Sequence, residues 1–596
     1  MERTSTITEG ESPYRLSTGE PLVSRADFPS PKAEYLAAFE EADQPFLYYY
    51  HVEDGRIKTQ CLTRGQFLEL ARRGAACIIH QGLHKGDRVA HCFSDNSPSD
   101  LILRLAEALT GAVPVTINWQ ADNEERILYK ITASRAKIIF YDEGFEKKIE
   151  NMRLALKGNT LLPIRALETF APAADRDLPP LAYEDEKIII FTSGTTGLPK
   201  GVILPHRSYL ANRLTFEDYF RLPPSLPLDL LLVNPLHHTN SSALSDWGIR
   251  RRNAVIHLVQ RYSSLFWLIL AEAAKKKRGI FITSLVPRHF DFLEKLHEEA
   301  RLPLDKAELE AALSETEILI GSAPVGPTTV NNALKFSNRL PRVRFGSTET
   351  CLQVMAIPVT VTQEETMAAF VAGWNHHYQG EKTPGYYIGR EHPPFTMVRI
   401  VKAVDPGKEG YMHLCEPGEP GYLITRGANL MSGYVTQTGN TASVFREGWY
   451  TGLRDLGFAL PAENGRSDYY WTGRDSAMLI RGGANYAYEQ VAADLSRVLV
   501  EDFHLAPEQF RLAIVGLKIE SEHEDSCCVT IELQEEALGK REALTRDFLA
   551  TAARKAPKGC RPDYVRFGEI PRSFKGAVLY PKLKEDFEKH LMLCRT

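Results

Sequence analysis

The segment from Ile188 to His206, "IIIFTSGTTGLPKGVILPH", combines residue types that can bind phosphate. Its β-branched run predicts a buried strand, and the Thr-, Ser- and Gly-rich residues after it predict a loop at the carboxyl end of that strand. Small residues let backbone N–H groups approach a ligand, hydroxyls add donors, and Lys200 adds a positive charge. The spacing is not that of a Walker A loop, because Pro199 precedes the lysine and Gly201 follows it. An ordinary glycine-rich turn is the alternative interpretation.

The composition sets limits on the class of protein. The chain has 596 residues, too many for one core, so two or more domains are expected. A net charge of −5 gives no indication of nucleic-acid binding. No apolar signal segment is recognised at the start, and the run "LFWLILA" from Leu265 is too short to cross a bilayer. Nine cysteines without metal-ligand spacing predict free thiols and a cytoplasmic protein.

The elements that position the loop follow from hydrophobic periodicity. Residues 61–160 alternate helical patterns with short β-rich runs, which predicts layered α/β structure with a largely parallel sheet. This alternation continues to about residue 358, and strand patterns with Pro and Gly turns then predict a β-rich subdomain over 385–434. We expect a lead segment over 1–50, a large nucleotide-binding body over 51–473 and a small, mobile α+β domain over 474–596.

Further motifs follow the loop in order. They are "ILIGSAPV" from Ile318, "RFGSTET" from Arg344, "GYLITRGANLMSGY" from Gly421, "GWYTGLRDLG" from Gly448, "TGRDSAMLIRGGANY" from Thr472 and "PRSFKGAVLYPKL" from Pro571. The ordered set resembles the adenylate-forming superfamily of acyl- and aryl-CoA synthetases, peptide-synthetase adenylation domains and luciferases. The resemblance spans roughly Leu62 to Leu583. Its most specific motifs are the glycine-rich loop and "FGSTE".

The resemblance implies a site for ATP and Mg²⁺. It implies phosphate contacts from Thr192, Ser193, Gly194, Thr195, Thr196, Gly197 and Lys200, and contacts on the adenine side from Gly321, Ser322, Ala323, Pro324 and Phe345. Gly346 and Ser347 would also contact the nucleotide. It further implies that Thr348 contacts the α-phosphate and that Glu349 holds Mg²⁺, a hard cation that prefers carboxylate and phosphate oxygens. Asp455 would bind the ribose, Arg474 would follow it, and His238 would lie beside the acyl pocket.

The implied reaction has two steps. A carboxylate attacks the α-phosphate of ATP to give an acyl-adenylate and pyrophosphate, and a thiol, usually that of CoA, then displaces AMP. Positioning and charge neutralisation provide most of the catalysis in such chemistry. The phosphate loop would hold the leaving pyrophosphate, and the partners would be a small-molecule carboxylic acid and CoA.

Three departures from the family pattern bear on activity. Asp455 lies one residue later than expected after Trp449, and Ser476 stands where an Asp or Lys is usual at the interdomain hinge. The family's C-terminal signature ends in a lysine that assists adenylation, and a gap-free alignment puts Ala577 at its place. Lys575, two residues upstream, is the candidate substitute.

Three functions therefore stay open. The first is an acid–thiol ligase of the acyl-CoA synthetase type, the second an acyl-adenylate former that serves a carrier protein or an amine. The third is a nucleotide-binding pseudoenzyme, for which Ala577 and Ser476 are the arguments. The segment "NPLHHTNSSALSDW" would line the acyl pocket, and its polar residues favour a small or polar acid over a fatty acid.

Overall fold

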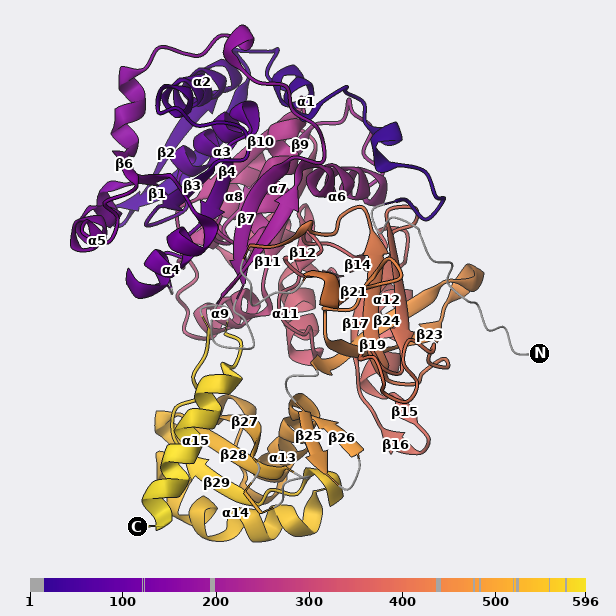
Figure 1. Ribbon diagram of the computed structural model, residues 1–596. Coiled ribbons are helices and arrows are strands. Elements are labelled where there is room, and N and C mark those ends of the chain that lie inside the picture. The colour runs from indigo at the N-terminus through magenta and orange to yellow at the C-terminus, as the bar shows by residue number, and fades with distance from the viewer. Residues whose placement is uncertain are drawn as a thin grey trace.

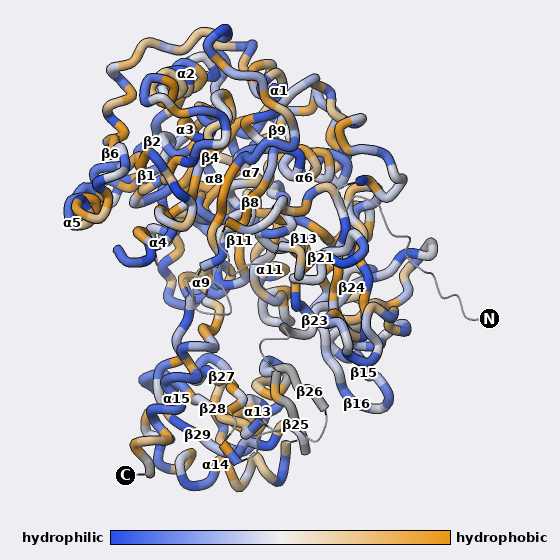
Figure 2. Tube along the Cα trace, viewed as in Figure 1, coloured by the Kyte–Doolittle hydropathy of each residue, from blue (hydrophilic) through white to orange (hydrophobic). Residues whose placement is uncertain are grey.

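The computed structural model describes residues 15–595, except 121, 123, 193–198, 436–440, 475–477, 482–483, 518, 521–524, 557 and 574–575. A large body carries a smaller C-terminal lobe below it (Figure 1). Hydrophobic residues are concentrated inside the body, around β4 and β9, whereas the hairpin of β15 (His377–Tyr378) and β16 (Glu381–Lys382) is largely hydrophilic (Figure 2). Among the described residues, no helix is both long and apolar enough to cross a membrane.

The first sheet of the body positions the phosphate-loop segment. Its order is β20 (Gly433–Tyr434), β8 (Lys200–Pro205), β7 (Glu186–Thr192), β4 (Val113–Thr116), β3 (Arg88–Cys92), β5 (Ile138–Tyr141) and β6 (Thr160–Pro163). Strands β3, β4, β5 and β7 run parallel, so their carboxyl ends share one edge, whereas β8 returns antiparallel to β7. The connecting helices are α2 (Arg64–His80), α3 (Pro98–Thr110), α4 (Glu124–Ser134), α5 (Glu146–Met152) and α6 (His206–Tyr219).

The second sheet contains another parallel block, in which buried β-branched and leucine residues predominate. The block is β10 (Ala254–Val259), β9 (Leu228–Leu232), β11 (Ile280–Leu285), β12 (Glu317–Ile320) and β13 (Arg342–Phe345). Its crossover helices are α7 (Thr239–Arg250), α8 (Phe266–Lys276), α9 (Pro287–Glu298), α10 (Lys306–Ser314) and α11 (Pro327–Ser337). Strands β1 (Pro45–Glu53) and β2 (Arg56–Thr63) extend the block beyond β10. This confirms the expected layered α/β body.

The remaining strands of the second sheet are antiparallel. They are β14 (Met355–Ala356), β17 (Tyr386–Glu391), β18 (Thr396–Val401), β19 (Gly421–Gly427), β21 (Phe445–Arg446), β22 (Trp449–Tyr450), β23 (Asp455–Pro461) and β24 (Ser467–Arg474). Helix α12 (Gln363–Trp374) packs beside β17. Strand β20 leaves this group and pairs with β8, with Gly433 opposite Ile203 and Tyr434 opposite Val202. This pairing ties the β-rich part to the first sheet.

The C-terminal lobe is a small α+β unit. Its sheet contains β27 (Phe510–Leu517), β28 (Ser526–Leu533) and β29 (Tyr564–Phe567), and a hairpin of β25 (Met478–Arg481) and β26 (Ala484–Ala487) precedes helix α13 (Tyr488–Phe503). Helices α14 (Arg541–Lys555) and α15 (Tyr580–Arg595) complete it. The chain just before α15, yellow in Figure 1, reaches from the lobe to α9 of the body. A mixed α/β body with a small α+β lobe is the fold class that the sequence predicts.

Candidate active site

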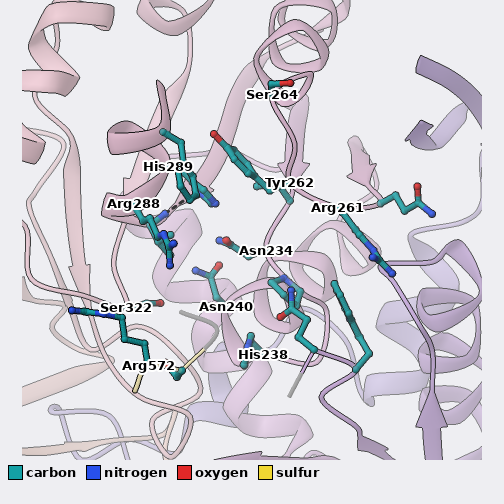
Figure 3. Close-up of a pocket in the computed structure, with 18 of the residues that line it drawn as sticks. Asn234, His238, Asn240, Arg261, Tyr262, Ser264, Arg288, His289, Ser322 and Arg572 are labelled. Atoms are coloured by element: carbon teal, nitrogen blue, oxygen red, sulfur yellow. Dashed lines mark hydrogen bonds between the residues drawn. The ribbon is translucent and has the colours of Figure 1, made fainter. Parts of the chain in front are cut away.

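A cavity of about 1090 Å³ lies where the carboxyl edges of the two sheets meet (Figure 3). Seven of its lining residues come within four residues after the end of a strand: Ser94 after β3, Trp119 after β4, Phe145 after β5, Asn234 after β9, Arg261 after β10, Val286 after β11 and Ser322 after β12. In open α/β sheets, ligands bind outside the carboxyl ends of the strands. The cavity therefore occupies the position where such folds bind ligands.

His238 lies on the cavity wall, as the N-cap residue of α7. Two side chains from the part of the chain that packs with the first sheet, Asn96 and Arg104, hold the loop before His238. Asn96 accepts from the Leu236 N–H at 2.9 Å and donates to the Val259 carbonyl at 3.0 Å. Arg104 donates to the Leu236 carbonyl at 2.8 Å. The position of His238 is thus set by contacts between the two sheet layers.

The "FGSTE" segment forms a compact turn after β13. Phe345 ends the strand half-buried, and Gly346 has no room for a side chain, because a Cβ there would lie 1.4 Å from the Leu352 carbonyl oxygen. The Ser347 N–H donates to the Thr350 hydroxyl at 2.8 Å. This hydrogen bond fixes the turn from within.

Thr348 links this turn to the start of α7. The Thr239 hydroxyl donates to the Thr348 hydroxyl at 2.9 Å, so Thr348 lies next to the helix that His238 caps. Thr348 and His238, expected to act on the α-phosphate and beside the acyl group, therefore occupy neighbouring positions.

Lys200 and Glu349 come together around Tyr434. The Tyr434 hydroxyl donates to Glu349 Oε1 at 3.3 Å, and Lys200 Nζ lies 5.7 Å from the centre of the Tyr434 ring. Lys200 also pairs with Thr192 in the β7–β8 register. Burial and then the Glu349 carboxylate raise the pKa of Tyr434, so the phenol stays neutral. An ammonium and a carboxylate separated by a neutral ring suit the phosphates and the Mg²⁺ of a nucleotide.

The other predicted phosphate-loop residues, Ser193, Gly194, Thr195, Thr196 and Gly197, lie outside the described residues, as do Ser476 and Lys575. The predicted adenine-side turn follows β12. Ser322 has φ = 70° and lines the cavity, and Ala323 and Pro324 are exposed. A Cβ on Gly321 would lie 2.9 Å from the Arg344 carbonyl oxygen, so the turn passes close to β13.

Asp455 and Arg474 occupy opposite positions of the β23–β24 ladder. Asp455 is buried, and the Trp471 indole N–H donates to its Oδ1 at 2.8 Å. The additional residue before it is accommodated by Arg454, which turns with φ = 55° and pairs with Asp405 at the surface. Asp455 therefore still begins β23, opposite Arg474, although it comes one residue later than the family pattern predicts.

Two tyrosines that the sequence analysis did not select join these groups. The Tyr434 and Tyr450 hydroxyls lie 3.2 Å apart. Burial raises the pKa of Tyr450, and the carboxylates of Glu349 and Asp455 raise it further, which places Tyr450 near both. Tyr434 ends the quoted motif "GYLITRGANLMSGY" and Tyr450 lies within "GWYTGLRDLG", so their place in these motifs was the signal available.

The C-terminal lobe contributes Arg572 and Ser573 to the cavity. Arg572 bridges to Val578, and the Ser573 N–H donates to the Ala577 carbonyl at 2.7 Å, so Ala577 lies beside a lining residue. Burial, then Arg511 and Arg288, lower the pKa of Arg572. Positive charge therefore gathers where the lobe meets the body.

The lining of the cavity is strongly cationic, a feature that the sequence analysis missed. Its cations are Lys148, Arg261, Arg288, Lys295, Arg301 and Arg572, whereas Glu299 is the one carboxylate among the described lining residues. Arg261 and Arg288 follow strand ends, as expected for residues that face a site. Such a lining suits an anionic ligand.

Relatives of known function are similar along most of the chain. The indoleacetate–CoA ligase of Aromatoleum aromaticum is 26% identical over 558 residues, covering 91% of this chain and 95% of the ligase. The human mitochondrial medium-chain acyl-CoA ligase ACSF2 is 26% identical, covering 89% and 84%. The luciferin 4-monooxygenase of Photinus pyralis is 24% identical, covering 88% of each chain.

Solved structures share the fold. The ATP-bound MatB of Rhodopseudomonas palustris has a TM-score of 0.71 at 21% identity, covering 94% of this chain and 99% of MatB. The O-succinylbenzoate CoA synthetase of Bacillus subtilis, in complex with ATP and magnesium, has a TM-score of 0.67 at 19% identity, covering 92% and 99%. Residues 37–435 match the AMP-binding enzyme family. With this match over most of its length and the adenylate-forming fold around its cavity, the chain belongs to the AMP-binding enzyme family.

Proposed function

We propose that the protein activates a carboxylic acid with ATP and transfers the acyl group to the thiol of CoA. In the first step a carboxylate oxygen bonds to the α-phosphorus while the α–β phosphoanhydride bond breaks and pyrophosphate leaves. In the second step the thiolate attacks the acyl carbon, the acyl–phosphate bond breaks, AMP leaves, and the thiol proton passes to solvent. The observation that carries the proposal is the meeting of Lys200, Glu349 and Tyr434 near Thr348, whose neighbouring helix α7 opens on the cavity.

The residues divide into three groups in this proposal. Thr192 and Lys200, with the loop from Ser193 to Gly197, would hold the leaving pyrophosphate, and Glu349 would hold Mg²⁺, which supplies neutralisation of phosphate charge when bound. Thr348 would contact the α-phosphate, and His238 would face the acyl group. The nucleoside contacts would come from Gly321, Ser322, Ala323, Pro324, Phe345, Gly346, Ser347, Asp455 and Arg474.

CoA as the acceptor is supported by the relatives named as CoA ligases and by the cationic lining that Arg288 and Arg572 provide. A carrier-protein thiol or an amine would serve the same first step. The acceptor is therefore tested separately from the activation.

The experiment measures the two steps apart. Exchange of labelled pyrophosphate into ATP, dependent on an added acid from a panel, reports adenylation, and release of AMP dependent on CoA reports transfer. We expect both for at least one acid. Nucleotide binding without exchange for any acid would refute the proposal.

A second function, nucleotide binding without efficient adenylation, is favoured by one observation. Ala577 lies beside Ser573 at the cavity, where the family pattern has a lysine. Losing one donor to a developing negative charge slows such steps by about 10²–10³. We expect synthetic acyl-adenylate plus CoA to give thioester faster than ATP plus acid does.

Two variants decide which residue serves adenylation. Ala577→Lys should raise the ATP-dependent rate more than the rate from acyl-adenylate. If Lys575→Ala abolishes adenylation and Ala577→Lys leaves it unchanged, Lys575 is the working residue.

A further inference from the structure

Arg344 is a buried arginine directly behind the cavity wall. It lies inside β13 and is 4% exposed. Its guanidinium donates to Asn240 Oδ1 at 2.7 Å and to the Ser284 hydroxyl. Its side chain passes under Gly321, where an added Cβ would lie 3.3 Å from Arg344 Cγ. Because Asn240 and Ser322 line the cavity, Arg344 is one layer away from any ligand there.

This positive charge is not compensated within the part of the chain that the structure describes. No described carboxylate forms an ion pair with Arg344, and its second terminal nitrogen has no hydrogen-bond partner. Burial lowers the pKa of Arg344 to about 9, so the guanidinium stays protonated at neutral pH. A buried charge without a counter-ion is costly, and such charges are normally paired. The position of Arg344 therefore favours an anion at the adjacent cavity.

Asn240 connects Arg344 to the cavity surface and extends its preference for an anion to that surface. Its Oδ1 is occupied by Arg344, so its Nδ2 hydrogens are the polar atoms left to face a ligand. Asn240 is also the second residue of α7, where the helix dipole favours negative charge. Figure 3 shows it on the wall with Asn234 and His238. A fatty-acyl chain at this place would leave those donors without acceptors.

We propose that the acid activated here carries a second carboxylate, as in a short-chain dicarboxylic acid, and that Asn240 and Arg344 recognise it. The proposal rests on the proposed adenylation and names its substrate class. Thr239 contacts Thr348, and the next residue, Asn240, contacts Arg344. Consecutive Cα atoms are about 3.8 Å apart, so the places for the reacting and the distal carboxylate are close together, and the spacer is short.

The test compares three acids of equal length for each chain of three to six carbons: the dicarboxylic acid, its monomethyl ester and the monocarboxylic acid. The ester keeps the carbon chain of the diacid, removes the distal charge and adds one methyl group. Because a hydrogen bond to a charged group contributes about 1.5–3 kcal/mol, we expect kcat/KM in pyrophosphate exchange to favour the best diacid over its ester by at least about tenfold. The ratio is independent of the fraction of folded protein.

Asn240→Asp is the decisive variant. Its Oδ1 can still accept from Arg344, but its other oxygen repels the distal carboxylate. We expect the ratio of diacid to ester to fall by about tenfold or more. Arg344→Met should lower the ratio in the same direction, and Arg344→Lys should restore part of it. Ser264→Asp, which adds the same charge at an exposed lining position, should leave the ratio unchanged.

Protection against thermal unfolding by each free acid is measured in parallel. If esters or monoacids are activated as well as diacids, the proposal is wrong although adenylation stands. If no acid supports exchange, but only diacids protect the protein and Asn240→Asp removes that protection, the recognition site stands and adenylation fails. If diacids are preferred neither in exchange nor in protection, the proposal is overturned.

Discussion

Charged side chains have different partners in two parts of the body: in one part they form ion pairs with each other, and in the other part some of them do not. In the network between α1 (Pro31–Ala37) and α7, Arg250 donates to Glu34 at 2.6 Å and to Asp246 at 2.7 Å. Lys187 adds a contact to Asp246 at 2.8 Å. In this network each cation meets a carboxylate, and the side chain of Arg250 is fully buried.

Arg344, Lys200 and Glu349, which lie behind or beside the cavity, form no ion pair with a described residue, although the lining residues Arg261, Lys295 and Arg301 pair with Asp95 or Glu299. Arg344 donates to neutral acceptors, and Tyr434 contacts Lys200 with its ring and Glu349 with its hydroxyl. Paired charges lose most of their attraction for a ligand, whereas unpaired charges keep it. The difference separates charges that hold the fold from charges that can bind a ligand, and it can be tested residue by residue.

The largest effect should come from breaking the paired network. Arg250→Met leaves Glu34 and Asp246 buried without their main partner, so we expect the free energy of unfolding to fall by about 3–5 kcal/mol. Denaturant unfolding measures it. The control is Arg252→Met, which removes only an exposed ion pair with Glu40 and should change stability by less than about 1 kcal/mol. Equal effects of the two variants would contradict the comparison.

Changes at the unpaired charges should show the opposite pattern. Lys200→Ala and Glu349→Gln should each slow MgATP-dependent pyrophosphate exchange by about 10²–10³, because in the proposed site each removes a charge that faces the leaving phosphates. Neither residue is in the core, so thermal unfolding without ligand should shift little. A large loss of stability in either variant would place that residue with the structural network.

A third prediction extends the comparison to pH. Burial would lower the pKa of His91, but Glu107 and Asp100 raise it to about 9. The stability from this paired group is therefore complete below about pH 6.5 and is lost as the pH rises through about 9, by about 3 kcal/mol. Unfolding in urea between pH 6 and 10 should show this fall, and His91→Gln should show a flatter profile. If the wild-type and His91→Gln proteins lose stability in parallel as the pH rises, the role of His91 is refuted.

The smallest effect should come from the residue that holds Asp455. Trp471→Phe removes one hydrogen bond, from the indole N–H to Asp455 Oδ1, worth about 1 kcal/mol. We expect MgATP to bind several-fold more weakly, with little change in the second step from synthetic acyl-adenylate. Isothermal titration with MgATP measures this. An unchanged affinity would mean that Asp455 is positioned without Trp471, or that it does not contact the nucleotide.

Local sequence patterns were sufficient to predict the fold class and the strand-end loops. A run such as Ile188–Thr192 becomes a strand because β-branched residues pack well in a sheet. The alternation of helical and strand periodicity likewise predicts layered α/β structure. The motif order indicated the family. The residue roles stay predictions.

Tertiary contacts determine which side chains lie close to those motifs in space. Strand β20 pairs with β8, which brings Tyr434 into contact with Lys200 and Glu349, and the chain before α15 brings Arg572 to the cavity. Neither follows from local periodicity, because strand partners and domain contacts join segments that are distant in sequence. Whether a buried charge such as Arg344 has a counter-ion depends on every segment packed around it, so only the folded structure shows that no described carboxylate pairs with this one.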